Sequence, residues 1–308
     1  MVELIIVVGL LTLLVALLLT GVQHAREAAR RTQCQSNLRN IGVAIELFDQ
    51  VHQQLPCATY GAPYNELGRT TGSALTKLLP HLEQQSLSSS YDWSVDWTAA
   101  VNQRAVNTQV SVFRCPSSAG DAIQQGLRTA TGESLAERTA AVGDFTAVYS
   151  WGFPLAMPTE PVWRDIWGVG ALSPLTEENA FAAPKRSRVR DGAANTLTFV
   201  ERAASTDRWI GGELAETSPS TARDWAPWAG QGCVWLLSYV DGGRAWSPTG
   251  LGPCNVNCSN HQGVYAFHPG AANVLFLDGH VKALSASVEA ETLFALVTRA
   301  RGDRAVVP

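Results

Sequence analysis

Residues 1–31 read MVELIIVVGLLTLLVALLLTGVQHAREAARR, and the chain continues to Leu55 before its first proline, Pro56. We predict that this stretch forms one long helix with two different halves. Residues 4–22 are apolar on every side, and about 20 such residues are enough to span the hydrocarbon core of a bilayer. No other run is long enough, so the sequence predicts a single membrane pass.

The second half of the predicted helix is amphipathic. Its apolar residues recur at alternating spacings of four and three, which places them on one stripe that must pack on something: Cys34, Leu38, Ile41, Ile45 and Phe48. Glu27 precedes Arg31 by four residues, and we expect the two to pair on the solvent-facing side.

Glu3 is a carboxylate at the edge of the apolar run. Such a group is costly in a membrane unless it is paired. Two interpretations stay open at this point. Glu3 lies among the lipid head groups, or it pairs with a positive group on a neighbouring subunit.

The start of the chain, the segment AREAARR at 25–31 and the segment CQSNLRNIG at 34–42 resemble the N-terminal helix of type IV pilin-like proteins. More narrowly, they resemble the pseudopilin-like group known as domain-of-unknown-function family 1559. In that group a prepilin peptidase cuts after a leader glycine, the new N-terminal phenylalanine is methylated, and a glutamate follows, which Glu3 matches. Met1 falls where the group has leucine, so the leader glycine and the phenylalanine are absent. Either the true start lies upstream, which we favour, or the chain is not processed in the manner of the group.

Further segments carry the same resemblance: LLPHLEQ at 78–84, FRCPS at 113–117, DFT at 144–146 and RVRDGAANTLTFVE at 188–201, in which Ala194 replaces a serine. His268 and Asp278-Gly279 are separated by nine residues, as in the C-terminal His-(nine residues)-Asp-Gly domain of these proteins. The resemblance implies an α+β, pilin-like fold. Residues 1–55 would form the helix, packed on a mainly antiparallel β-sheet head of residues 56–308 with short helices and a C-terminal hairpin motif at 261–285.

Patterns within the head predict its elements only coarsely. We expect a helix over 73–87, capped by Ser73 and kinked or broken at Pro80, and helices over 97–107 and 288–298. Strands are expected at 110–113, 141–151 and in the segment ending at Glu201. Residues 116–140 are expected to be mostly loop, and residues 152–184 an extended surface excursion.

Three strands are predicted near the C-terminus, at 265–267, 273–277 and 280–284. Asp278-Gly279 is the two-residue signal for a tight hairpin turn. In that register Phe276 faces Val281 and Val274 faces Ala283.

His268, Asp278 and His280 allow two interpretations. They meet in a metal or acid/base site, or Asp278-Gly279 makes the turn while His268-Pro269-Gly270 ends a strand, which the sequence favours. Cys254 and Cys258 suit a local disulfide better than a zinc site with His261. Cys34, Cys57, Cys115 and Cys233 allow three pairings, and Cys34 on the apolar stripe also suits a buried thiol.

The chain has 308 residues and a formal net charge of −4, so its charge gives no basis for nucleic-acid binding. The basic residues His24, Arg26, Arg30 and Arg31 follow the span and alone would place the head in the cytoplasm. Six cysteines favour an oxidising compartment, and the family resemblance agrees. We expect a single-pass inner-membrane protein with a periplasmic head, or an extracellular one in a filament.

No enzyme motif is present, and we predict that the protein is not an enzyme and takes no cofactor or metal. The resemblance implies a structural subunit of a type IV pilus-like or type II secretion pseudopilus-like filament. Its partners would be other pilin-like subunits, the inner membrane and a prepilin peptidase, with Glu3 as the assembly residue. The alternative is a membrane-tethered binding or catalytic domain. Ten tryptophans suggest carbohydrate as one ligand for it, although most tryptophans are core residues.

Overall fold

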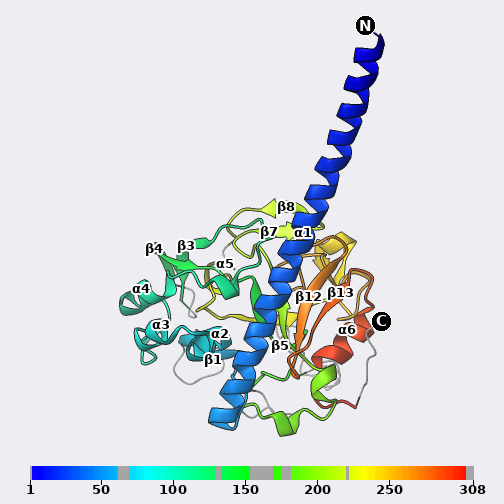
Figure 1. The fold of residues 1–308 in the computed structure, drawn as a ribbon. Helices are drawn as coiled ribbons and strands as arrows, with labels where there is room; N and C mark the ends of the chain where they lie inside the picture. Colours follow the sequence, from blue (N-terminus) through cyan, green and yellow to red (C-terminus); the bar gives the residue numbers. More distant parts are fainter. Residues whose placement is uncertain are drawn as a thin grey trace.

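A computed structural model of the chain describes residues 2–61, 69–129, 133–152, 169–174, 182–219 and 222–302. The fold is α+β, with one long helix, short helices and a mainly antiparallel sheet (Figure 1). The α-helices are α1 (Val2–His52), α2 (Ala74–Leu78), α3 (Gln85–Ser89), α4 (Gln103–Val106), α5 (Ala222–Trp225) and α6 (Ala290–Val297). The 3-10 helices are η1 (Leu79–Leu82), η2 (Ala100–Asn102), η3 (Ser111–Phe113), η5 (Arg186–Arg188), η6 (Ala193–Asn195) and η7 (Asp241–Gly243). The strands are β1 (Thr59–Gly61), β2 (Thr70–Ser73), β3 (Ile123–Arg128), β4 (Ser134–Ala141), β5 (Phe145–Trp151), β6 (Leu197–Glu201), β7 (Arg208–Ile210), β8 (Glu213–Glu216), β9 (Cys233–Leu236), β10 (Tyr239–Val240), β11 (Ala245–Trp246), β12 (Ala271–Phe276) and β13 (Val281–Ser285).

Helix α1 has the two halves that the sequence predicts. Its N-terminal half extends beyond the head (Figure 1), and its described side chains up to Arg26 are exposed. By length and composition this half can cross a membrane. The predicted stripe of the second half is buried, from Cys34 at 0% exposed to Phe48 at 4%. The expected Glu27–Arg31 pair is wrong, because Glu27 faces the head and pairs with Arg30 one turn away.

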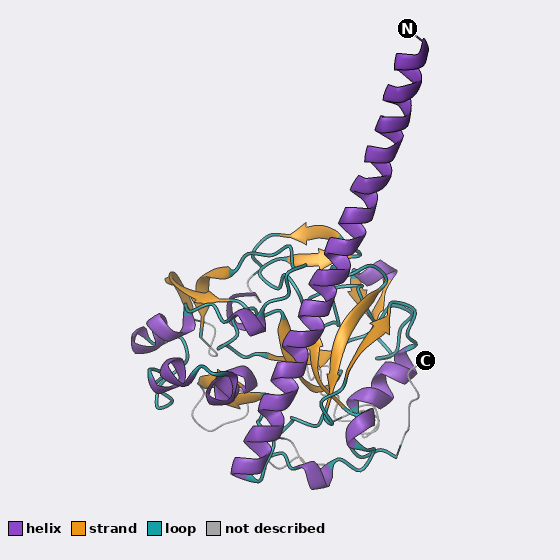
Figure 2. Ribbon diagram, in the orientation of Figure 1, coloured by secondary structure: helices purple, strands orange, loops and turns teal. Residues whose placement is uncertain are grey.

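The central sheet has the strand order β13-β12-β6-β5-β9, and only the β5–β9 pair is parallel. Figure 2 shows α1 crossing in front of these strands. Alternate strand residues face opposite sides, as in any pleated sheet. Leu275 of β12 packs with the α1 stripe, whereas Val274 and Phe276 pack with Leu293 of α6. The sheet therefore separates two apolar cores, one under α1 and one under α6.

The C-terminal hairpin forms, but its predicted register is wrong by one residue. Leu275 pairs with Val281, and Val274 pairs with Lys282. The loop holds three residues, because the Gly279 N–H donates to the Phe276 carbonyl (3.0 Å) and Gly279 adopts φ +88°. This is a turn followed by a left-handed glycine, a common alternative to the two-residue loop.

Three other predictions of local structure are wrong. Residues 110–113 hold the 3-10 helix η3 rather than a strand, since the segment packs under α1, where Asn37 donates to the carbonyls of Ser111 and Arg114. Residues 116–140 contain the hairpin β3–β4, whose half-exposed strands lack a clear periodicity. The strand predicted at 265–267 does not form, and residues 264 and 265 make only isolated β-bridges.

The remaining predictions of local structure fare better. The helix over 73–87 starts at a Ser73 capping box and breaks into α2, η1 and α3, with Pro80 inside η1. The predicted helix over 97–107 is shorter, as η2 and α4, and the C-terminal helix is α6. Strands form as predicted at β5 and β6. Most of the predicted excursion at 152–184 lies outside the described residues.

A second set of contacts fixes the C-terminal end of α1 to the head. Arg186 binds Asp49 (2.9 Å) and Glu46 (2.5 Å) and also donates to the Leu277 carbonyl (3.3 Å). Nearby, Gly42 lets α1 approach the hairpin closely: a Cβ there would lie 3.0 Å from Leu275 Cδ1 and 3.3 Å from Gly279 Cα. The helix is therefore held by the turn of the C-terminal hairpin as well as by its apolar stripe.

Candidate functional site

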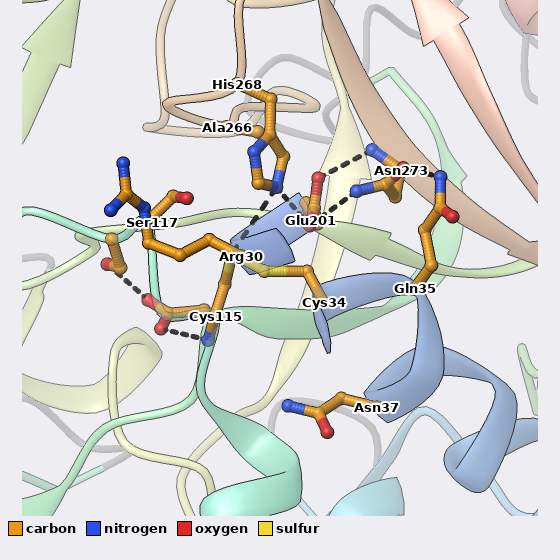
Figure 3. Close-up of polar contacts among 12 residues, drawn as sticks. Arg30, Cys34, Gln35, Asn37, Cys115, Ser117, Glu201, Ala266, His268 and Asn273 are labelled. Atoms are coloured by element: carbon orange, nitrogen blue, oxygen red, sulfur yellow. Dashed lines mark hydrogen bonds and ion pairs between the residues drawn. A yellow bond between two sulfur atoms is a disulfide. The ribbon is translucent and has the colours of Figure 1, made fainter. Parts of the chain in front are cut away.

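The candidate site is a buried polar cluster where α1 meets the head. Glu27 and Cys34 come from one face of α1, since residues seven apart lie two turns apart on a helix. Cys115 follows η3, Glu201 ends β6, and His268 precedes β12. Figure 3 shows the His268 ring pointing toward Glu201 and toward the disulfide formed by Cys34 and Cys115.

His268 lies between two carboxylates. Its Nδ1 is 2.6 Å from Glu27 Oε1, and its Nε2 is 3.4 Å from Glu201 Oε1. The side chains of His268 and Glu201 are fully buried, and that of Glu27 is 21% exposed. A carboxylate only accepts hydrogen bonds, so the imidazolium, with two N–H donors, satisfies both neighbours.

The charge states follow from these contacts. Burial lowers the pKa of His268, but the hydrogen bonds and negative charges of Glu201 and Glu27 outweigh it, and the pKa lies above the ordinary value. Partial burial raises the pKa of Glu27, but hydrogen bonds from His268, Arg30 and Ser117 outweigh that effect, and the pKa is lowered. The pair is therefore an ion pair between α1 and the head.

Asn273 of β12 holds the Glu201 carboxylate through two hydrogen bonds. The Asn273 backbone N–H donates to Glu201 Oε2 (2.6 Å), and the Asn273 amide donates to Oε1 (3.0 Å). Gln35 of α1 donates to Asn273 Oδ1 (3.0 Å), so the network returns to the helix (Figure 3). These donors fix the carboxylate's orientation.

A covalent link lies beside the ion pair. Cys34 and Cys115 form a disulfide that joins positions 81 residues apart, and Cys115 Sγ is 3.5 Å from His268 Nε2. The Cys115 N–H donates to buried Asp144 (2.9 Å), which also pairs with Arg114. Cys34 is thus not the buried free thiol that was one interpretation of the sequence.

The motif residues do not form one site. Asp278 and Gly279 make the hairpin turn at one end of β12, as the favoured interpretation predicts, and His280 Nδ1 lies 2.6 Å from Asp278 Oδ1. His268 lies at the other end of β12. The hypothesis of a joint site of His268, Asp278 and His280 is therefore wrong, and His268 also ends no strand. Its contact to Glu27 docks the long helix.

The other cysteines follow the sequence in part. The predicted disulfide between Cys254 and Cys258 is present, which removes those thiols from a zinc site with His261. His261 instead stacks on Trp225 with 6.2 Å between ring centroids. Of the described cysteines, Cys57 and Cys233 are free.

Glu3 and the tryptophans lie away from this cluster. Glu3 is exposed near the far end of α1, within the half that extends beyond the head. Four tryptophans are buried in the head: Trp97, Trp151, Trp228 and Trp235. Among the tryptophans in the described ranges, Trp246 is the exposed one, at 48%. The described rings therefore serve mainly as core.

One set of potential metal ligands occurs among the described residues. Cys34, Cys115, Glu201 and His268 are all buried, and one ligand atom of each lies within 4.8 Å of the others. In the structure the two sulfurs are joined, so the site's present chemistry is docking: one disulfide and one ion pair fix α1 to the sheet.

The sequence alone points to His268 but not to its partners. Local patterns place Glu27 in a solvent-facing pair, give Glu201 no role, and leave the partner of Cys34 open. The signal was nevertheless present, because each member belongs to a segment that carries the family resemblance: 25–31, 34–42, 113–117, 188–201 and the C-terminal motif. These separate segments meet at one point in space.

Comparison with known proteins gives one match. The family model described as protein of unknown function (DUF1559) matches residues 23–291. That range contains every member of the cluster. No curated protein and no solved structure matches significantly.

Proposed function

The chain belongs to the DUF1559 family, and from that premise we propose that it is a structural subunit of a type IV pilus-like or type II secretion pseudopilus-like filament. In this proposal the N-terminal halves of neighbouring α1 helices pack together as the filament core. The heads cover the outside.

The observation that carries the proposal is that one half of α1 is packed on the head and the other half is not. Residues 27–48 are fixed to the head by a disulfide, an ion pair and a buried apolar stripe. The described side chains of residues 2–26 contact no part of the head closely enough to be covered. An apolar helix that is fixed to its head is suited to exchanging lipid for the helices of neighbouring subunits. A simple membrane tether would not need to be fixed to the head.

A second apolar surface supports the same packing. Val43, Leu47 and Val51 recur every four residues on the outer side of the docked half and are 59%, 40% and 67% exposed. They extend the apolar surface of the first half along the helix. The occupant that fits this stripe is the α1 helix of another copy, because both surfaces are helical and apolar.

In this proposal Glu3 sets the axial register between neighbouring α1 helices. An unpaired carboxylate in an apolar core costs several kcal/mol, on the order of the penalty for any buried ion. As the resemblance implies, the α-amine of an adjacent subunit neutralises it. Only one axial offset between helices brings the two charges together, so the pair selects that offset.

Location and partners follow from the same proposal. The single predicted span anchors the chain in the inner membrane before assembly. Two disulfides suit a periplasmic or extracellular head, because such bonds persist in oxidising compartments. A prepilin peptidase and other pilin-like subunits are the expected partners. Intact mass of the protein from its native membranes tests peptidase processing, since a methylated, trimmed N-terminus has a distinct mass.

Substitution of Glu3 tests assembly. Glu3→Ala and Glu3→Gln are expected to leave the amount of membrane-inserted protein unchanged and to abolish filaments in sheared fractions viewed by electron microscopy. Glu213→Ala, on exposed β8, is the matched control and should assemble normally. Filaments of wild-type abundance in both Glu3 variants would contradict the proposal.

The alternative is a tethered binding domain, and one pocket favours it. Arg202, Arg208, His261 and Trp225 line this pocket with Asp207. Burial, together with Arg208 and Arg202, lowers the pKa of His261 to about 4, so the arginines supply the positive charge. An anionic ligand suits this lining. Calorimetric titration with small anions such as acetate and sulfate, using Arg208→Ala as control, tests it.

A further inference from the structure

We propose that Cys34, Cys115, His268 and Glu201 form a zinc site in the reduced chain, and that oxidation replaces the metal with the disulfide. This inference is independent of filament assembly and concerns how α1 is held to the head. Cysteines enter the chain as thiols, so the four ligands exist before the disulfide forms.

The donor set suits zinc. Two thiolates, one imidazole and one carboxylate are ligands that Zn²⁺ takes in four-coordinate sites, and the two sulfurs favour it over Mg²⁺ or Ca²⁺. All four residues are buried, and their ligand atoms lie within 4.8 Å of one another. They come from α1, the segment after η3, the end of β6 and the loop before β12. A single ion would therefore join four separate parts of the fold.

The distances around His268 match a tetrahedral ion. Zn–S bonds of about 2.3 Å and Zn–N bonds of about 2.0 Å place sulfur and nitrogen ligands about 3.5 Å apart. Cys115 Sγ and His268 Nε2 are 3.5 Å apart. Nitrogen and oxygen ligands of zinc lie about 3.3 Å apart, and His268 Nε2 is 3.4 Å from Glu201 Oε1. As thiolates, the two sulfurs are free to separate to the roughly 3.8 Å that zinc requires.

The surrounding groups already orient these ligands. A metal-binding histidine usually donates its second ring N–H to a carboxylate. His268 Nδ1 lies 2.6 Å from Glu27 Oε1, which leaves Nε2 for the metal. Glu201 is fixed by both nitrogens of Asn273. The protein thus provides an outer shell for the imidazole and for the carboxylate.

The exchange balances as a two-electron reaction. Zinc binding to the reduced chain displaces one proton from each of the two thiols and the Nε2 proton of the His268 imidazolium. A thiol–disulfide oxidant then accepts two electrons from the two thiolates and two protons from water, so that its own disulfide becomes two thiols. The Cys34–Cys115 bond forms, Zn²⁺ leaves, and His268 Nε2 takes up a proton again. In both states α1 stays linked to the head, by metal first and covalently afterwards.

The experiment uses the full chain in detergent, reduced with a phosphine and titrated with Co²⁺ and then with Zn²⁺. The background carries Cys254→Ser and Cys258→Ser, because reduction also frees those thiols near His261. We expect one equivalent of Co²⁺ with the visible and charge-transfer absorption of tetrahedral thiolate coordination, displaced by Zn²⁺. The oxidised chain should bind none. Glu27→Gln should weaken binding about 10- to 100-fold, and Cys115→Ser should abolish it.

A second readout needs no variant of the cluster. In the reduced chain, Zn²⁺ should protect Cys34 and Cys115 from alkylation, as mapped by peptide mass spectrometry, while Cys57 is alkylated at the same rate with and without zinc. Equal alkylation of Cys34 with and without zinc, in a chain whose circular dichroism shows it folded, would overturn the site. So would cobalt binding that survives Cys115→Ser.

Discussion

His268 Nδ1 lies 2.6 Å from Glu27 Oε1, so a residue of the C-terminal motif holds the N-terminal helix across 241 positions of sequence. The same histidine contacts the disulfide that joins Cys34 to Cys115. Glu27 of α1 and His268 before β12 are thereby fixed to each other at the base of the extended half of α1.

The ion pair makes stability depend on pH in the oxidised protein. The pKa of His268 is raised, so its contribution is full below 6.5 and is lost as the pH rises through the higher folded value. The pKa of Glu27 is lowered, so its contribution is full above 4.5 and is lost as the pH falls through the lower folded value. Thermal unfolding with a chelator present should show maximal stability between these limits. His268→Gln should remove the alkaline decline, and an unchanged decline would contradict the assignment.

The two disulfides should differ in their contributions. On the chain-entropy model, closing the 81-residue separation between Cys34 and Cys115 contributes about 4–5 kcal/mol, and the separation of four between Cys254 and Cys258 contributes about 2 kcal/mol. The double variant Cys34→Ser/Cys115→Ser should therefore lower the melting temperature more than Cys254→Ser/Cys258→Ser. Calorimetry on both variants checks the order, and equal losses would argue against helix docking by Cys34.

Gly42 and Gly21 of α1 are suitable as a test position and its control, because only Gly42 lies close to the head. A Cβ at Gly42 meets Leu275 and the backbone of Gly279, whereas nothing lies within 4 Å of one at Gly21. Gly42→Val should destabilise the protein by about 1–3 kcal/mol, the usual cost of overpacking. Gly21→Val should change stability by less than about 0.5 kcal/mol, as surface substitutions do. Denaturant unfolding of both variants measures the difference, and equal effects would show that the close approach is absent.

Arg186 should contribute a smaller, salt-dependent amount. Its partners Glu46 and Asp49 are 51% and 18% exposed, so solvent screens the pairs. Arg186→Ala should cost about 1 kcal/mol at low ionic strength and less at high salt. A cost independent of salt would assign the effect to the hydrogen bond with the Leu277 carbonyl instead.

The sequence predicted the elements whose pattern is local. The α1 stripe of Cys34, Leu38 and Ile41 follows from helical spacing, and the short disulfide follows from two nearby cysteines. The hairpin register was wrong because the Asp278-Gly279 signal fits two loop lengths. The His268–Glu27–Glu201 cluster was missed because no local pattern encodes which distant segments meet.

Photo-crosslinking in native membranes tests the filament proposal most directly. A benzophenone amino acid at Leu11, in the extended half of α1, should give a ladder of crosslinked copies of this chain. The same group at exposed Val101 on the head is the control, and Glu3→Ala should remove the ladder. If Leu11 gives only monomers and lipid adducts while the protein is fully folded and inserted, the helix is a tether and the central proposal is wrong.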